Sequence, residues 1–185
     1  MTLDRRTFVR DAGLGLLAFN VAGAVLMATP AQARKRRLPF QTLKPEEALT
    51  LEALGDVLVP GAKEAGLAHY VDQQLSGPHA ESMLMIKYLG VPPPVYPFYA
   101  AASGAINRAS RSRFEKAFTR LDDDEAVELV QTMSKENPAG WEGPPAPFFY
   151  FVLRSDALDV RYGTEKGFAE LGIPYMAHIK PPSDW

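Results

Sequence analysis

Apolar side chains recur every three or four residues along most of the chain beyond residue 45, the spacing that lines one face of an α-helix. The clearest stripe runs through Ala126, Leu129, Val130 and Met133. The aromatic block at residues 148–153 could also form a strand, but no other segment offers it a partner strand. Because an unpaired strand leaves its backbone hydrogen bonds unmade, the pattern predicts an all-α fold.

Proline, glycine and acidic residues mark where the predicted helices begin and end. Pro45 suits a first helical turn, and Asp122 forms a capping-box pattern with Glu125. The predicted helices run from Pro45 to a stop at Pro60, from Leu67 to near Gly77, from Met83 to Leu89 as a short and largely buried helix, from Pro97 to about Arg120 as one helix or as two with a break near Ser110, from Asp122 through Met133, over residues 148–153, and around residues 165–171.

The chain is rich in proline, with 16 in 185 residues. The prolines gather at residues 92–97 and 138–147, where large apolar neighbours predict stiff loops on the surface of the domain. Beyond residue 160 the chain mixes glycine, proline, tyrosine and isoleucine. We therefore expect a single irregular helical domain with long proline-rich loops and an extended aromatic C-terminal tail.

The first 33 residues have the pattern of a bacterial twin-arginine export signal. Arg5 and Arg6 are followed by Phe8, and residues 12–28 carry no charge. Glycines and one asparagine dilute this apolar run, as is typical of signals for the route that carries folded proteins. The run falls slightly short of the ~20 apolar residues that a membrane-spanning helix needs.

A small-x-small cleavage site, Ala31-Gln32-Ala33, follows the apolar run. It predicts a signal peptide over residues 1–33 and a helical domain over residues 34–185. The basic run at residues 34–37 would then form a new terminus, which we expect to be disordered.

The chain has no cysteine and a formal net charge of −2. The missing cysteines exclude disulfides, thiolate-ligated iron–sulfur clusters, haem attachment through paired cysteines and cysteine nucleophiles. The charge balance gives no electrostatic case for binding nucleic acid. Met83 and Met85 are expected to fill the core rather than to bind a metal.

Histidine and acidic residues form no strong catalytic or metal-binding pattern. His69 lies three residues before Asp72, which could place two ligands on one helix face, although such a pair is more often a solvated polar face. The acidic groups at residues 46–47 and 122–125 fall at predicted helix starts, where capping and the helix dipole explain them. We therefore assign no catalytic, cofactor-binding or metal-binding residue to this chain.

The C-terminal tail carries large apolar side chains that a small helical domain cannot easily bury. Tyrosine and tryptophan are favoured anchors at protein interfaces. We expect the tail to lie against a partner or to wrap back over the chain's own helices, and the two are not exclusive. The predicted interface residues are Tyr162, Gly163, Ile173, Pro174, Tyr175 and Trp185.

Several short motifs keep a particular order along nearly the whole chain. They are the arginine-pair signal, residues 40–47 before the first helix, residues 54–60 at the end of that helix, residues 66–75 in the second helix, the Tyr162-Gly163 pair and residues 171–174. In this order and spacing the chain resembles the gluconate 2-dehydrogenase subunit 3 family, the small subunits of membrane-associated flavoprotein dehydrogenases.

The resemblance implies a non-catalytic role within a complex. In such complexes a GMC-type large subunit binds FAD and oxidises a sugar, polyol or sugar acid, and a multihaem cytochrome c subunit usually passes electrons to the membrane. The small subunit carries no cofactor, supplies the export signal read by the Tat translocase, and helps the folded large subunit to mature. The resemblance thus implies a periplasmic protein associated with the membrane through its complex.

Two alternatives stay open at this point. One is a free-standing periplasmic enzyme or ligand-binding protein whose pocket wall is formed by Tyr96, Phe98, Phe148 and Tyr150. The other is a membrane-anchored scaffold that keeps its signal segment.

Overall fold

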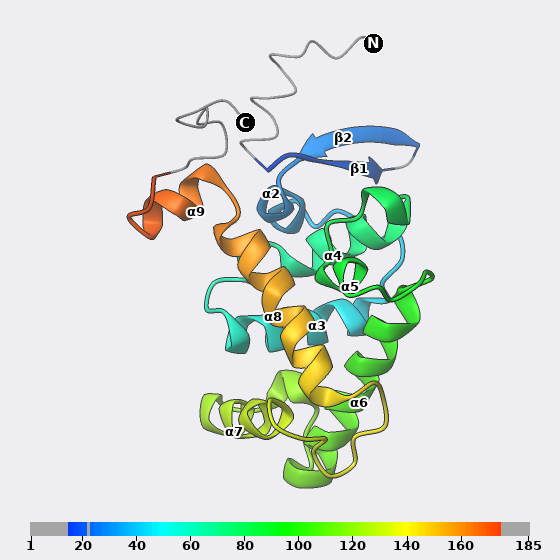
Figure 1. Cartoon of the computed structure of the whole chain (residues 1–185), viewed down its shortest axis with the longest axis vertical. Helices are drawn as coiled ribbons and strands as arrows, with labels where there is room; N and C mark the ends of the chain where they lie inside the picture. Colours follow the sequence, from blue (N-terminus) through cyan, green and yellow to red (C-terminus); the bar gives the residue numbers. More distant parts are fainter. Residues whose placement is uncertain (1–14, 22, 175–185) are drawn as a thin grey trace, which may run out of the picture.

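Helices make up most of the computed structural model, which describes residues 15–21 and 23–174 (Figure 1). The elements in chain order are β1 (Leu17–Val21), β2 (Ala24–Ala28), α2 (Pro30–Lys35), α3 (Pro45–Leu58), α4 (Leu67–Ser76), the 3-10 turn η1 (His79–Glu81), α5 (Met85–Tyr88), α6 (Tyr96–Phe114), the 3-10 turn η2 (Phe118–Arg120), α7 (Asp123–Met133), α8 (Ala146–Tyr162) and α9 (Glu165–Glu170). The expected mainly helical domain is confirmed.

Helix α3 is the centre of the packing, because it contacts α4, α6, α7 and α8. Its Leu51 and Leu54 have no exposed surface. Fully buried side chains from the other helices meet them, including Ile106 of α6, Met133 of α7 and Phe149 of α8. Burying one such side chain stabilises the fold by about 1.5–3 kcal/mol, so these helices form a single apolar core.

The predicted starts of α3 and α7 are confirmed. Pro45 is the first residue of α3, and the Glu47 carboxylate accepts a hydrogen bond from the Lys44 amide at 2.9 Å. At α7, the Asp122 and Glu125 side chains each accept a hydrogen bond from the other's backbone amide, at 3.0 and 3.1 Å. These acidic residues therefore satisfy helix-terminal amides, as the sequence predicts.

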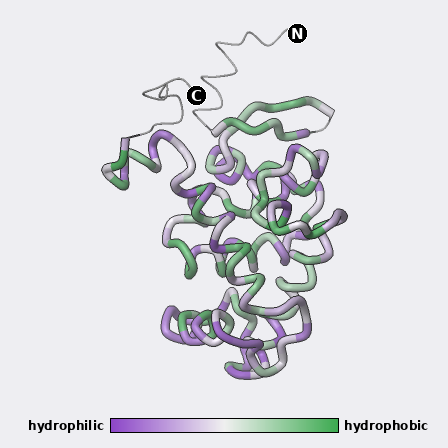
Figure 2. The backbone as a smooth tube through the Cα atoms, in the orientation of Figure 1, coloured by the Kyte–Doolittle hydropathy of each residue, from purple (hydrophilic) through white to green (hydrophobic). Residues whose placement is uncertain are grey.

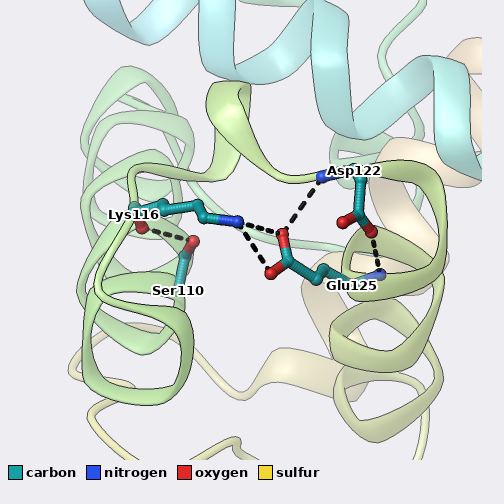
Figure 3. Close-up of polar contacts among 4 residues, drawn as sticks. All are labelled: Ser110, Lys116, Asp122 and Glu125. Carbon is teal, nitrogen blue, oxygen red and sulfur yellow. Dashed lines mark hydrogen bonds and ion pairs between the residues drawn. The ribbon is translucent and has the colours of Figure 1, made fainter.

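The α7 capping box also ties α7 to the end of α6 (Figure 3). Lys116 Nζ contacts both carboxylate oxygens of Glu125, at 2.9 and 3.0 Å. The backbone carbonyl of Lys116 accepts a hydrogen bond from Ser110 Oγ at 2.7 Å. Because Ser110 lies within α6, this chain of contacts fixes the connection between the two helices.

Of the two alternatives for residues 97–120, the single helix is confirmed and the break near Ser110 is wrong, but the predicted end near Arg120 lies too far along the chain, because Phe118–Arg120 form the separate 3-10 turn η2. Helix α6 runs without interruption to Phe114 and ends where Glu115 adopts a left-handed conformation, with φ of 60°. The prediction for residues 148–153 was too short, because α8 continues from Ala146 to Tyr162. The tail therefore begins after Tyr162 rather than at residue 160.

The segment around α5 is shorter and less buried than expected. Only Leu84 and Ile86 are fully buried, whereas Met83 is 45% exposed, so its predicted place in the core is wrong. Lys87 Nζ reaches the backbone carbonyls of Ala80 and Ser82, which keeps one side of this turn polar.

Residues 15–21 and 23–33 of the predicted signal peptide contain secondary structure, whereas residues 1–14 lie outside the described residues. Strands β1 and β2 form an antiparallel hairpin with Leu17 opposite Ala28, and both strands are largely apolar (Figure 2). Helix α2 follows and packs against α4. The expected disorder of residues 34–37 is wrong for Arg34 and Lys35, which belong to α2. None of the described helices combines the length and the apolar character needed to cross a lipid bilayer.

Candidate partner interface

His69 and Asp72 face the same connecting segment but do not converge on a common point. The Asp72 carboxylate accepts hydrogen bonds from the amides of residues 41–43, each at 2.8 Å. His69 Nε2 lies 3.1 Å from the Leu38 carbonyl oxygen, and its ring lies 4.6 Å from that of Phe40. Both side chains are buried, so the solvated polar face expected from the sequence is wrong. Together they fasten the segment that leads into α3.

Burial lowers the pKa of the His69 imidazole below its ordinary 6.5. Among the described residues, no three histidine, aspartate or glutamate side chains gather in a way that could hold a metal ion. His69 and Asp72 thus serve as anchors for the backbone in this structure.

Asp156 is a buried acid that sequence reasoning missed. It lies in α8 with no exposed surface, and its two oxygens accept hydrogen bonds from the Met85 amide at 2.8 Å and from the Tyr99 hydroxyl at 2.7 Å. It therefore joins α5 and α6 to α8. Burial raises the pKa of the Asp156 carboxyl to about 7. Burial also raises the pKa of Tyr99 well above its usual range, which keeps that hydroxyl a donor.

Asp156 should make the stability of the protein depend on pH. Its pKa is about 7 in the folded state and 3.8 as the unperturbed value, so the folded protein binds the proton more tightly. The stabilisation that comes from proton binding at Asp156 is complete below pH 4. As the pH rises through 7 this stabilisation is lost, and the free energy of unfolding falls by roughly 2–4 kcal/mol.

The measurement is denaturant unfolding at pH 4.5, 6 and 8 for the wild type and for Asp156→Asn. The difference between the two proteins isolates the contribution of Asp156 to the pH dependence of stability from that of His69. The lowered pKa of His69 makes stability rise with pH, which is the opposite direction. Equal pH dependence in both proteins would contradict the assignment.

Of the four aromatic residues proposed as a pocket wall, Phe98 and Phe148 pack against each other. The Phe98 ring meets those of Tyr99, Phe148 and Phe149 edge to face, with centroids 5.4–5.6 Å apart. The Tyr96 hydroxyl donates a hydrogen bond to the Glu47 carboxylate at 3.2 Å. These aromatic contacts stabilise the junction of α6 and α8. None of the four residues lines either of the two open clefts beside α2.

Two open clefts flank helix α2. One, of about 750 Å³, lies between α2 and the α8–α9 junction and includes Pro30, Arg161 and Glu170. The other, of about 780 Å³, includes Lys35, Arg37 and the apolar residues at the start of α3. Neither contains Asp156 or Asp72.

The predicted interface residues have four different placements. Tyr162 is half-buried and packs against the chain's own core, with the Arg161 guanidinium 4.8 Å above its ring. Gly163 ends α8, and its amide donates to the Asp159 carbonyl at 2.8 Å. Ile173 and Pro174 are exposed. Tyr175 and Trp185 lie outside the described residues.

Helix α9 sits directly against the end of α8. Gly167 is buried, and a Cβ there would lie 2.5 Å from Tyr162 Cα, so the two backbones touch. Arg161 and Glu170 form an ion pair across the same junction. The packing leaves three apolar residues in contact with solvent, and we call Leu171, Ile173 and Pro174 the C-terminal patch. Leu171 is 49% and Ile173 50% exposed.

These features describe a helical domain whose buried polar groups hold its own backbone and which exposes apolar surface at residues 171–174. Residues 45–178 match the family described as gluconate 2-dehydrogenase subunit 3, so the chain belongs to this family of dehydrogenase-complex subunits. The matched region begins at the first residue of α3 and includes the C-terminal patch. No curated protein and no solved structure matches the chain.

Proposed function

We propose that the chain is the non-catalytic small subunit of a periplasmic flavoprotein dehydrogenase complex. The observation that carries the proposal is the family match over residues 45–178, joined on one chain to the arginine pair at residues 5–6. The arginine pair and Phe8 lie outside the described residues. In this proposal the Tat translocase exports the chain together with its folded partner.

The partner is a GMC-type large subunit that binds FAD and oxidises a sugar, a polyol or a sugar acid. A multihaem cytochrome c subunit would pass the electrons on and hold the complex at the membrane. The small subunit contributes the export signal and stabilises the large subunit. Two buried acids support a non-catalytic role for the small subunit. The side-chain oxygens of Asp72 and Asp156 already accept hydrogen bonds from backbone amides and from a tyrosine hydroxyl.

The C-terminal patch is the proposed contact with the large subunit. Exposed apolar side chains that are surrounded by a rim of polar residues are typical of protein interfaces. Here Leu171 and Ile173 are about half exposed and lie next to the charged residues Lys166 and Glu170. The close packing of Gly167 on Tyr162 holds the patch in place relative to the core.

The first test is to express a candidate GMC-type flavoprotein with and without this chain. We expect the flavoprotein to be exported and active only in the presence of the chain. A chain with Arg5→Lys and Arg6→Lys should still bind the flavoprotein but leave it in the cytoplasm. A flavoprotein that folds, is exported and works equally well alone would overturn the proposal.

The second test replaces the C-terminal patch. Leu171→Asp combined with Ile173→Asp should weaken binding to the flavoprotein about 30-fold, the effect of losing ~2 kcal/mol at an interface centre. Val127→Asp is the matched control, because Val127 is 44% exposed on α7 and far from α9 along the chain. Equal affinity of the patch variant and the control would exclude this surface as the contact.

A further inference from the structure

The predicted cleavage motif lies inside a folded helix. Ala31 and Ala33 both belong to α2, and Ala33 has no exposed surface. Ala33 packs in a small apolar cluster with Phe19 and Ala28 of the hairpin, and Leu38 packs against this cluster. Proteases cut extended, accessible backbone, which is why cleavage concentrates at exposed loop tips and termini. The Ala33–Arg34 bond lies in a helix rather than in extended backbone, and Ala33 on one side of it has no exposed surface.

Helix α2 has its own start signal. The Thr29 hydroxyl accepts a hydrogen bond from the Gln32 amide at 3.2 Å, and the Gln32 side chain accepts one from the Thr29 amide at 3.1 Å. Pro30 occupies the first helical position. A helix of this length is not stable by itself in water, so contacts with the rest of the domain must hold it.

The first of these contacts is between backbones. Gly66, at the start of α4, has φ of 89°, and a Cβ there would lie 2.2 Å from the Pro30 carbonyl oxygen and 2.8 Å from the Ala31 amide nitrogen. Only glycine allows both the left-handed conformation and this approach. Helices α2 and α4 therefore touch at Pro30, which precedes the cleavage motif, and at Ala31, its first residue (Figure 1).

Three further contacts surround the motif. Arg34 Nε lies 3.1 Å from Glu52 Oε1, and Glu52 is only 8% exposed in α3. In the hairpin, the Phe19 ring meets the edge of His69 at 6.5 Å, and the Asn20 carbonyl accepts a hydrogen bond from the Gln41 side chain at 3.0 Å. The segment on both sides of the Ala33–Arg34 bond is thus fastened to α3, to α4 and to the segment between α2 and α3.

We propose that folding protects the Ala33–Arg34 bond from hydrolysis, and that β1, β2 and α2 stay in the folded protein as a structural part of the domain. The consequence for the cell rests on the proposed export, because the twin-arginine route delivers a folded chain to the peptidase. Cleavage would then require α2 and the hairpin to open first, at a rate set by the population of the open form.

The test in solution uses elastase, which cuts after small side chains such as alanine, on the purified full-length chain. Mass spectrometry follows the fragment that begins at Arg34. We expect this fragment to form on the order of 100-fold more slowly than from an unstructured peptide of residues 26–41, because only the open form is cut. Equal rates for the chain and the peptide would overturn the proposal.

Two matched pairs of variants locate the protection. Gly66→Ala should speed the cut at least about tenfold, whereas Gly90→Ala, equally left-handed at φ of 73° but with open space around it, should leave the rate within about twofold. Glu52→Gln should speed the cut roughly threefold, and Glu46→Gln, exposed on the same helix, should not. If Gly66→Ala fails to fold by circular dichroism, the glutamate pair decides. Equal rates within the deciding pair would contradict the role of α2 docking.

The test in cells determines the N-terminus of the exported chain in its complex. A chain that still contains residues 15–33 is the expected result, and a folded, exported chain that begins at Arg34 would overturn the proposal. A chain that is not exported at all would count against the proposed function, while the elastase rates would still test the protection of the bond.

Discussion

Asp156→Ala is expected to lower the free energy of unfolding by about 3 kcal/mol, because it leaves two buried donors without an acceptor. The Met85 amide and the Tyr99 hydroxyl both donate to this carboxyl group, and neither Asp156 nor Tyr99 has exposed surface. Water cannot easily replace the lost acceptor at a site this deep in the core. The change should therefore loosen α5 and α6 from α8 together.

Asp156→Asn should be milder, with a loss of about 1 kcal/mol, because the amide oxygen still accepts one hydrogen bond. Urea unfolding at pH 6 measures both variants. Arg154→Ala is the control on the same helix, since Arg154 is exposed and should change the free energy of unfolding by less than about 0.5 kcal/mol. A loss for Asp156→Ala as small as that of the control would show that the carboxylate is not a stabilising junction.

The helices with strong local signals could be predicted from the sequence. At α7, the capping box and the stripe through Ala126, Leu129, Val130 and Met133 are all found where expected, and each of these four side chains is buried. At α3, Pro45 and the two glutamates after it marked the start. These features depend on residues three or four apart, so a linear pattern contains the necessary information.

Helix α8 is longer than the helix that the sequence pattern predicted. The aromatic block at residues 148–153 was recognised, but the same buried face continues through Asp156 and Ala157. An acid on an apolar helical stripe is itself a signal of a buried partner, and it could have drawn attention to Asp156. Its partners, Met85 and Tyr99, are 71 and 57 residues away, and no local pattern identifies them.

The hairpin could not be predicted by periodicity. Its strands are apolar on both faces, so the alternation that marks a half-buried strand is missing. The same composition also suits the core of a signal peptide. What distinguishes the folded segment is its tertiary contacts, such as Gly66 against Pro30, which a linear pattern does not show.

The candidate interface was predictable in part. Sequence reasoning selected Ile173 and Pro174, which are exposed, but also Tyr162, which packs on the chain's own core. It did not select Leu171, which is 49% exposed beside them. The difference arises because α9 folds back on the end of α8, and that close approach depends on Gly167.

Asp72→Ala is expected to lower the free energy of unfolding by about 3–4 kcal/mol. Hydrogen bonds to a charged group are worth ~1.5–3 kcal/mol each, but the loss should be smaller than the sum of three, because the amides of the exposed Gln41 and the half-buried Thr42 can bond water instead. Its carboxylate is 3% exposed and accepts the amides of Gln41, Thr42 and Leu43. These three residues form the approach to α3, the helix at the centre of the core. Asp124→Ala, an exposed acid in the first turn of α7, should lose less than about 1 kcal/mol.

Local measurement separates this role from a general loss of stability. Asp72→Ala should increase hydrogen exchange first at the amides of residues 41–43, while amides in α7 keep their protection until the whole domain unfolds. Because Gln41 also donates to the Asn20 carbonyl, exchange in β1 should increase as well. Uniform exchange across α3, α7 and the 41–43 segment would mean that Asp72 stabilises the domain as a whole and does not specifically fasten this connection.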